Sequence, residues 1–97
     1  MKDVDARKKI YGLDLDCVKK RLCDPVSKSG LGWKKKKANE VEVYYKAFLF
    51  VCWNNKDGRN IPTVDIDNFW HYHILHTKKY FKDSKKIFGK YYHHTPF

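Results

Sequence analysis

Histidine is the residue type in this chain whose placement most clearly indicates chemistry. All five histidines of the 97-residue sequence lie between positions 71 and 94. His71, His73 and His76 form one group, and His93 and His94 form the other. Imidazole is the commonest metal ligand in proteins and titrates near neutral pH. The last quarter of the chain is therefore where we expect a site.

Asp67 and His71 have the most useful spacing within this region. Positions i and i+4 are neighbours on a helix, so the carboxylate would lie beside the imidazole, where it can fix the tautomer and raise the basicity of the ring. A turn further along the chain would bring His93 or His94 back to the same place. Two imidazoles and one carboxylate suit zinc or ferrous iron with open coordination positions. The predicted metal ligands are therefore Asp67, His71, His93 and His94.

The same residues have alternative interpretations that need no metal. An Asp–His pair on a helix edge is commonly a surface hydrogen bond, and protonated His93 and His94 would be favourable at a helix C-terminus. Catalysis has little support from the sequence. No serine or cysteine nucleophile adjoins the histidines, and the chain has neither a glycine-rich phosphate loop nor an HExxH motif.

The other two histidines have different expected roles. His73 lies about 200° around a regular helix from His71, so these two side chains cannot chelate one ion. We expect His73 to pack with Tyr80 as a structural residue, near the structural Trp70. His76 is expected to point towards solvent and to be dispensable.

The charge of the chain is strongly positive and almost entirely due to lysine. There are 21 basic and 11 acidic residues, which gives a net charge of +10, and only three of the basic residues are arginine. Lysine is a solvated point charge, so such a surface suits non-specific attraction to nucleic acid or to an acidic protein. The predicted polyanion-binding patch is Lys34, Lys35, Lys36 and Lys37. A lysine excess is equally typical of proteins encoded by AT-rich genomes.

The cysteines and the hydropathy pattern indicate a cellular location. Cys17, Cys23 and Cys52 are odd in number, contain no CxxC pair and follow no signal peptide. They are typical of reduced thiols in the cytoplasm or another reducing intracellular compartment, or in a virion. The longest apolar stretch, at 47–53, is far too short to span a bilayer, so we expect no membrane partner.

The hydrophobic spacing predicts an all-α fold, a small single-domain bundle of about four helices. A polar, flexible arm at 1–12 would precede the domain at 13–97. The helices are expected at about 14–24, 34–53, 63–81 and 83–92. The second is apolar nearly all round, which is typical of a central buried helix. Because the helix dipole disfavours cations at an N-terminus, this helix would start either at the lysines or nearer Asn39. The expected core residues are Phe48, Leu49, Trp70, Ile74, Phe81 and Phe88.

Several short motifs in this order resemble a known family. D-x-x-W-H-x-H-I-L lies at 67–75, T-x-x-Y at 77–80, F-G at 88–89 and H-H-x-P at 93–96, with G-W and Y-x-x-F-L upstream at 32–33 and 45–49. Over roughly residues 13–97 the chain resembles the glycine-rich domain-containing protein-like family. The resemblance implies a small helical domain that occurs alone in microbes and viruses and within larger plant proteins. It also matches Asp67, His71, His93 and His94 individually, but it implies no particular reaction.

Two departures from the family pattern affect the functional interpretation. Ser84 stands where the family often has cysteine, which removes a thiolate ligand, and the lysines at 34–37 replace an acidic or mixed stretch. The leading hypothesis is a non-catalytic binding or structural module with a histidine-rich patch that could hold zinc or iron. The alternative is a basic accessory protein that binds nucleic acid or an acidic protein partner. A metal-dependent enzyme is the third.

Overall fold

The computed structural model describes residues 1–55 and 60–94, and all regular elements in this part of the chain are helices. The helices are α1 (Asp3–Tyr11), α2 (Asp16–Cys23), the short 3-10 helix η1 (Val26–Lys28), α3 (Lys35–Asn54), α4 (Val64–Leu75) and α5 (Thr77–Phe88). The all-α prediction is confirmed, with one α-helix more than expected among the described residues. Residues 56–59 and 95–97, which include the Thr95-Pro96 part of the H-H-x-P motif, lie outside this part of the chain.

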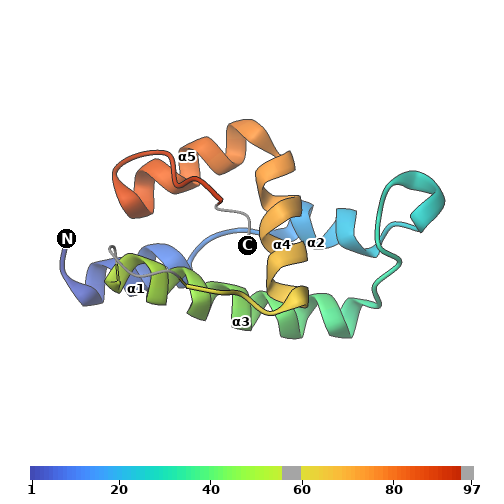
Figure 1. Ribbon diagram of the computed structural model, residues 1–97, viewed down its shortest axis with the longest axis horizontal. Coiled ribbons are helices and arrows are strands. Elements are labelled where there is room, and N and C mark those ends of the chain that lie inside the picture. The colour runs from blue at the N-terminus through green and yellow to red at the C-terminus, as the bar shows by residue number, and fades with distance from the viewer. Residues whose placement is uncertain (56–59, 95–97) are drawn as a thin grey trace.

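The longest helix, α3, is the base on which the other helices are arranged. Figure 1 shows α3 along the length of the molecule with α4 standing across its middle. Helix α1 packs beside α3, α2 packs against both α3 and α4, and α5 folds back from α4 to reach α1. The chain after α5 then returns towards α4. No helix in the described residues combines the length and apolarity needed to cross a membrane.

Residues 3–11 correct the prediction of a flexible N-terminal arm, because they form α1. Ala6 and Ile10 lie one turn apart on this helix and are completely buried. The remaining positions of α1 are largely polar, so two inward-facing residues were too few to produce a periodic signal in the sequence.

The helix expected to run from 63 to 81 is divided in two at His76. In a continuous helix the backbone N–H of His76 would donate to the carbonyl of Tyr72. Instead this N–H donates to the carbonyl of His73 at 3.1 Å, and Nδ1 of the His76 ring lies 2.8 Å from the Tyr72 carbonyl oxygen. The imidazole thus replaces the backbone donor, and the chain changes direction before α5. The expectation that His76 points freely into solvent is therefore wrong.

The break also changes which residues reach the core. Phe81 is 51% exposed, because the turn at His76 removes it from the face that carries Trp70. Its predicted place in the core is wrong. Helix α5 ends at Gly89, whose φ of 76° suits glycine, so the expected helix from 83 to 92 is not formed.

The rest of the predicted core is largely confirmed. Phe48, Leu49 and Trp70 are buried, and Ile74 and Phe88 pack against the core while partly exposed. Helix α3 is not buried all round, because its outer face exposes Val43, Tyr44 and Val51. It begins at Lys35 rather than near Asn39, with the lysines in its first turn.

Replacement of Trp70 tests this packing. Trp70 is 3% exposed and contacts Phe48 of α3 at a ring-centroid distance of 5.3 Å. Trp70→Ala should lower the free energy of unfolding by about 3–5 kcal/mol, since it removes a large buried area and leaves a cavity. The half-exposed Phe81 supplies the control, because Phe81→Ala should lower the free energy of unfolding far less than Trp70→Ala does. Urea unfolding measures both, and equal losses in the two variants would contradict this core.

Candidate functional site

The four predicted metal ligands do not form a cluster. Asp67 and His94 do meet, with Oδ1 of Asp67 2.5 Å from Nε2 of His94, whose ring lies 4.3 Å from that of Trp70. His71 is exposed on α4, and the exposed His93 packs its ring against Tyr91. Within residues 1–55 and 60–94, no group of three His, Cys, Asp or Glu side chains is placed to hold a metal ion. The structure therefore brings one of the two alternative histidines, His94, to Asp67, but it gives no support to a metal site shared with His71 among the described residues.

The most deeply held histidine is His73, which had been expected only to pack with Tyr80. It is 1% exposed. Its Nδ1 lies 2.7 Å from the Tyr45 hydroxyl of α3, and its Nε2 lies 2.9 Å from Oδ2 of Asp83 on α5. Tyr80 contributes an edge-on ring contact at 4.9 Å. One side chain of α4 therefore joins three helices through buried polar contacts.

The protonation states of these hydrogen-bonded side chains follow from their burial and from their hydrogen-bond partners. Burial lowers the pKa of His73 more than the hydrogen bond to Asp83 raises it. Burial alone would raise the pKa of Asp83, but hydrogen bonds from His73 and Lys79 hold it below the usual value. The lowered pKa keeps His73 neutral at pH 7, and because an ionised Asp83 can only accept, the single ring proton lies on Nε2 and is donated to Asp83. Its Nδ1 then accepts the proton of the Tyr45 hydroxyl.

The order Asp83, His73, Tyr45 resembles a catalytic carboxylate–histidine–hydroxyl relay, but its burial gives a different role. Tyr45 is completely buried, and Asp83 is only 7% exposed. Burial also raises the pKa of Tyr45 well above its ordinary value, so its hydroxyl stays protonated. A nucleophile must reach a substrate, and this hydroxyl has no route to one. The relay holds helices together.

A second set of buried hydrogen bonds joins α4 and α5 beside the contact between His73 and Asp83. Nε1–H of Trp70 donates to the Tyr80 hydroxyl at 2.9 Å, and that hydroxyl donates to the Tyr92 carbonyl. Trp70 precedes Tyr80 by ten residues, as His73 precedes Asp83. The two hydrogen bonds thus join equivalent positions one turn apart on α4 and α5. Burial raises the pKa of Tyr80 to about 12, so this hydroxyl also stays neutral near physiological pH.

Ser84, where the family often has cysteine, lies in the interior next to this link. It is 2% exposed and belongs to the buried side of α5. A cysteine at this place would be a buried thiol. Buried cysteines commonly act as small apolar side chains, so the serine changes the packing of the core more than it changes the surface chemistry.

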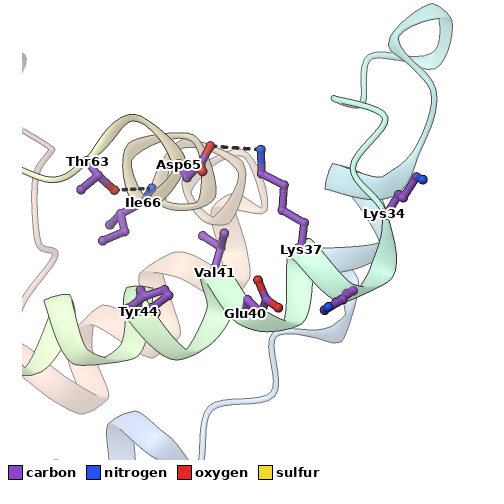
Figure 2. Close-up of a pocket in the computed structure, with 9 residues that line it drawn as sticks. Lys34, Lys37, Glu40, Val41, Tyr44, Thr63, Asp65 and Ile66 are labelled. Carbon is purple, nitrogen blue, oxygen red and sulfur yellow. Dashed lines mark hydrogen bonds and ion pairs between the residues drawn. The ribbon is translucent and has the colours of Figure 1, made fainter.

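The lysine patch borders a groove between α3 and the start of α4. The groove has a volume of about 750 Å³. Figure 2 shows side chains from both helices directed into it, with apolar groups between polar ones. It is lined by Lys34, Lys36, Lys37, Glu40, Val41, Tyr44, Thr63, Asp65 and Ile66. The sequence indicated the lysines but missed the apolar part, because Tyr44 was expected inside a buried helix and is 64% exposed.

The start of α3 concentrates positive charge at one edge of this groove. All four lysines from Lys34 to Lys37 are exposed, and no side chain caps the N-terminus of the helix. Lys37 lies 3.3 Å from Asp65 of α4 and 4.7 Å from the ring centre of Trp33. Among the described residues it is the one lysine of the four with an ion pair. The other three add their charge to the positive end of the helix dipole.

The comparison with protein families covers most of the chain. A family model described as UCP032817-like matches residues 13–97. The chain belongs to this family. Helix α1 lies outside the matched region, whereas the histidine residues, the groove and both buried links lie within it.

The relatives confirm the resemblance inferred from the motifs. Glycine-rich domain-containing protein 2 of Arabidopsis thaliana is 42% identical over 55 residues, and glycine-rich domain-containing protein 1 of the same plant is 36% identical over 55 residues. Each match covers 53% of this chain and 7% of the plant protein. The chain therefore corresponds to a small part of each relative. No solved structure matches it.

Sequence reasoning missed the partners of His73, although two signals were present. Asp83 is the one acidic residue between 77 and 97, in a segment rich in lysine. A single carboxylate is unusual on an otherwise basic surface. The equal spacing of Trp70–Tyr80 and His73–Asp83 would also have suggested paired links between two helices. Recognising them required the break at His76, because a continuous helix places these partners far apart.

The buried His73 predicts how stability depends on pH. The unfolded chain binds a proton to this imidazole near pH 6.5, whereas the folded protein does so only at lower pH. Between these two values the unfolded state holds more protons, so the free energy of unfolding should rise with pH and reach its full value above about 6.5. Asp83 has a lowered pKa, so its contribution is present above its usual range near 3.8 and is lost only at more acidic pH.

Urea unfolding at a series of pH values measures this dependence. The step between pH 7 and 5 should persist in His71→Gln, which changes an exposed histidine, and should be much smaller in His73→Gln. Stability that does not decrease on acidification of the wild-type protein would show that His73 is not held neutral.

Proposed function

We propose that this chain is a non-catalytic binding module whose α3–α4 groove holds an acidic, partly apolar segment of a partner protein. The observation that carries the proposal is the electrostatic conflict at the start of α3. Lysines follow one another at the uncapped, positive end of a 20-residue helix, where each raises the energy of the free protein. An anionic partner would relieve this conflict and gain favourable contacts with the free N–H groups of the first turn.

The apolar lining favours a protein segment over nucleic acid at this site. Val41 and Ile66 form the inner part of the groove, and Tyr44 stands at its side with most of its ring exposed. Glu40 and Asp65 also line the groove and would repel a continuous phosphate backbone. A peptide can place acidic side chains at the lysines and apolar ones over the ring, away from these carboxylates.

The remaining features agree with a module that binds without catalysis. His73, His76 and His94 are engaged in hydrogen bonds within the domain. In the two plant proteins the matching stretch is a small part of a much longer chain, as expected for a unit that serves a larger assembly. We do not include zinc or iron in the proposal, since no three of the predicted ligands gather at one point in the described part of the chain.

Selection from a random peptide library displayed on phage tests the proposal without a known partner. Peptides selected on the wild-type protein should be enriched in Asp and Glu beside Leu, Ile or Phe. Their affinity should fall about tenfold or more in the Lys34→Gln, Lys36→Gln, Lys37→Gln triple variant and should weaken with salt. Selected peptides without acidic enrichment, or with equal affinity for the triple variant, would contradict the proposal.

Two adjacent exposed residues of α3 test the apolar part of the groove. Tyr44 lines the groove and is 64% exposed, whereas Val43 is 61% exposed and does not line it. Tyr44→Ser should weaken the selected peptides several-fold by removing apolar contact area, while Val43→Ser should leave their affinity unchanged. Fluorescence anisotropy gives both dissociation constants, and the opposite order would place binding on another face.

A further inference from the structure

Helix α5 presents a second charged surface that the proposed groove does not use. Its exposed side carries Lys78, Lys82, Lys85 and Lys86. The one acidic residue of the helix, Asp83, is buried and engaged with His73 and Lys79. The outer side of α5 is therefore rich in lysine, and two carboxylates, Asp14 and Asp83, line a hollow at its edge together with Lys78, Lys82 and Lys86.

Aromatic rings lie within this lysine surface. Phe81 is 51% exposed, and Nζ of Lys85 lies 5.3 Å from its ring centre. The ring of Tyr91, partly exposed, follows at 6.4 Å from Phe81, and the exposed His93 packs against Tyr91 at 4.7 Å. Phe81, Tyr91 and His93 thus form a set of three rings, with Tyr91 next to each of the other two, beside the lysines of α5. We call this set the aromatic row.

We infer that the aromatic row and the lysines of α5 together bind single-stranded nucleic acid. Lysines attract the phosphate backbone, and exposed rings stack on bases that are not paired. The surface lacks arginine, the residue that most often reads base edges, so binding should tolerate many sequences. A duplex keeps its bases stacked internally and could use only the charges, which is why the rings favour a single strand.

This surface is separate from the groove. Figure 1 shows α5 at the end of the molecule remote from the start of α3, and none of the residues that line the groove belongs to α5. The inference therefore stands independently of the proposed function. It also gives His93 a role, since this exposed histidine was expected to bind a metal and instead lies in the aromatic row.

The test measures fluorescence anisotropy of fluorescein-labelled oligothymidine mixed with the full chain at several salt concentrations. The wild-type protein should bind, with an affinity that falls steeply as salt rises. Lys78→Gln, Lys82→Gln, Lys85→Gln in one variant should reduce the slope of log affinity against log salt by about 2, as expected for three lost phosphate contacts with a single strand. The matched control changes Lys34, Lys36 and Lys37 to Gln, with the same loss of charge, and should leave most of the slope.

Replacement of Phe81 separates stacking from simple charge attraction. Phe81→Leu keeps an apolar side chain of similar size but removes the ring, and should weaken oligothymidine about tenfold or more. Heparin, a polyanion without bases, should bind this variant as well as it binds the wild-type protein. Circular dichroism confirms that each variant is folded.

Three results would overturn the inference. One is the absence of oligothymidine binding at low salt, and another is a preference for the duplex over the single strand. The third is an equal effect of Phe81→Leu on oligothymidine and on heparin, which would show that charge alone governs the contact. Any of these results would leave the proposed peptide groove untouched, because binding at that groove is measured with a different ligand, the selected peptides.

Discussion

A buried histidine joins the three helices that surround the centre of this domain. His73 accepts from Tyr45 of α3 and donates to Asp83 of α5, and none of these groups can reach enough water to replace a lost partner. Leaving one buried polar group without a partner costs about 1–3 kcal/mol. Helix α5 is therefore held at one angle to α4. The second link, from Trp70 to Tyr80, fixes the same angle one turn away.

This constraint determines what the surface can present. Because α5 is held by its inner side, its lysines and Phe81 must face outward. The chain beyond Gly89 returns over Trp70, so Tyr92 stacks on that ring and His94 reaches Asp67. Helix α3 likewise turns one side towards the interior and the other towards the surface. Tyr45 points inward to the relay, while the neighbouring Tyr44 points outward beside the groove.

The sequence could predict the helical class and the burial of Trp70, because both depend on local hydrophobic spacing. It could not predict the break at His76, since that break depends on one imidazole capturing a backbone carbonyl that a helix would otherwise use. The helix expected at 83–92 stops short because α5 ends at Gly89, whereas the error at Phe81 follows from the break at His76. The relay through Tyr45 and Asp83 stayed hidden for the same reason, as its members come close only after the turn.

Histidine clusters in a sequence therefore have two physical explanations, which the spacing alone does not separate. A metal requires several ligands around one point, whereas a buried polar network requires each ring to find two partners of its own. In this chain His73 follows the second pattern, and the lysines at 34–37, whose number could also reflect genome composition, border a groove that combines charge with apolar lining.

Long-range ¹H–¹⁵N nuclear magnetic resonance of the imidazoles, recorded with and without one equivalent of zinc, tests most directly whether the histidines serve a buried polar network or a metal site. The account predicts that His73 at pH 7 is neutral with its proton on Nε2, that His76 carries its proton on Nδ1, and that zinc leaves both patterns unchanged. A charged His73, or zinc-induced changes shared by His71, His93 and His94, would contradict it and return the histidines to a metal site.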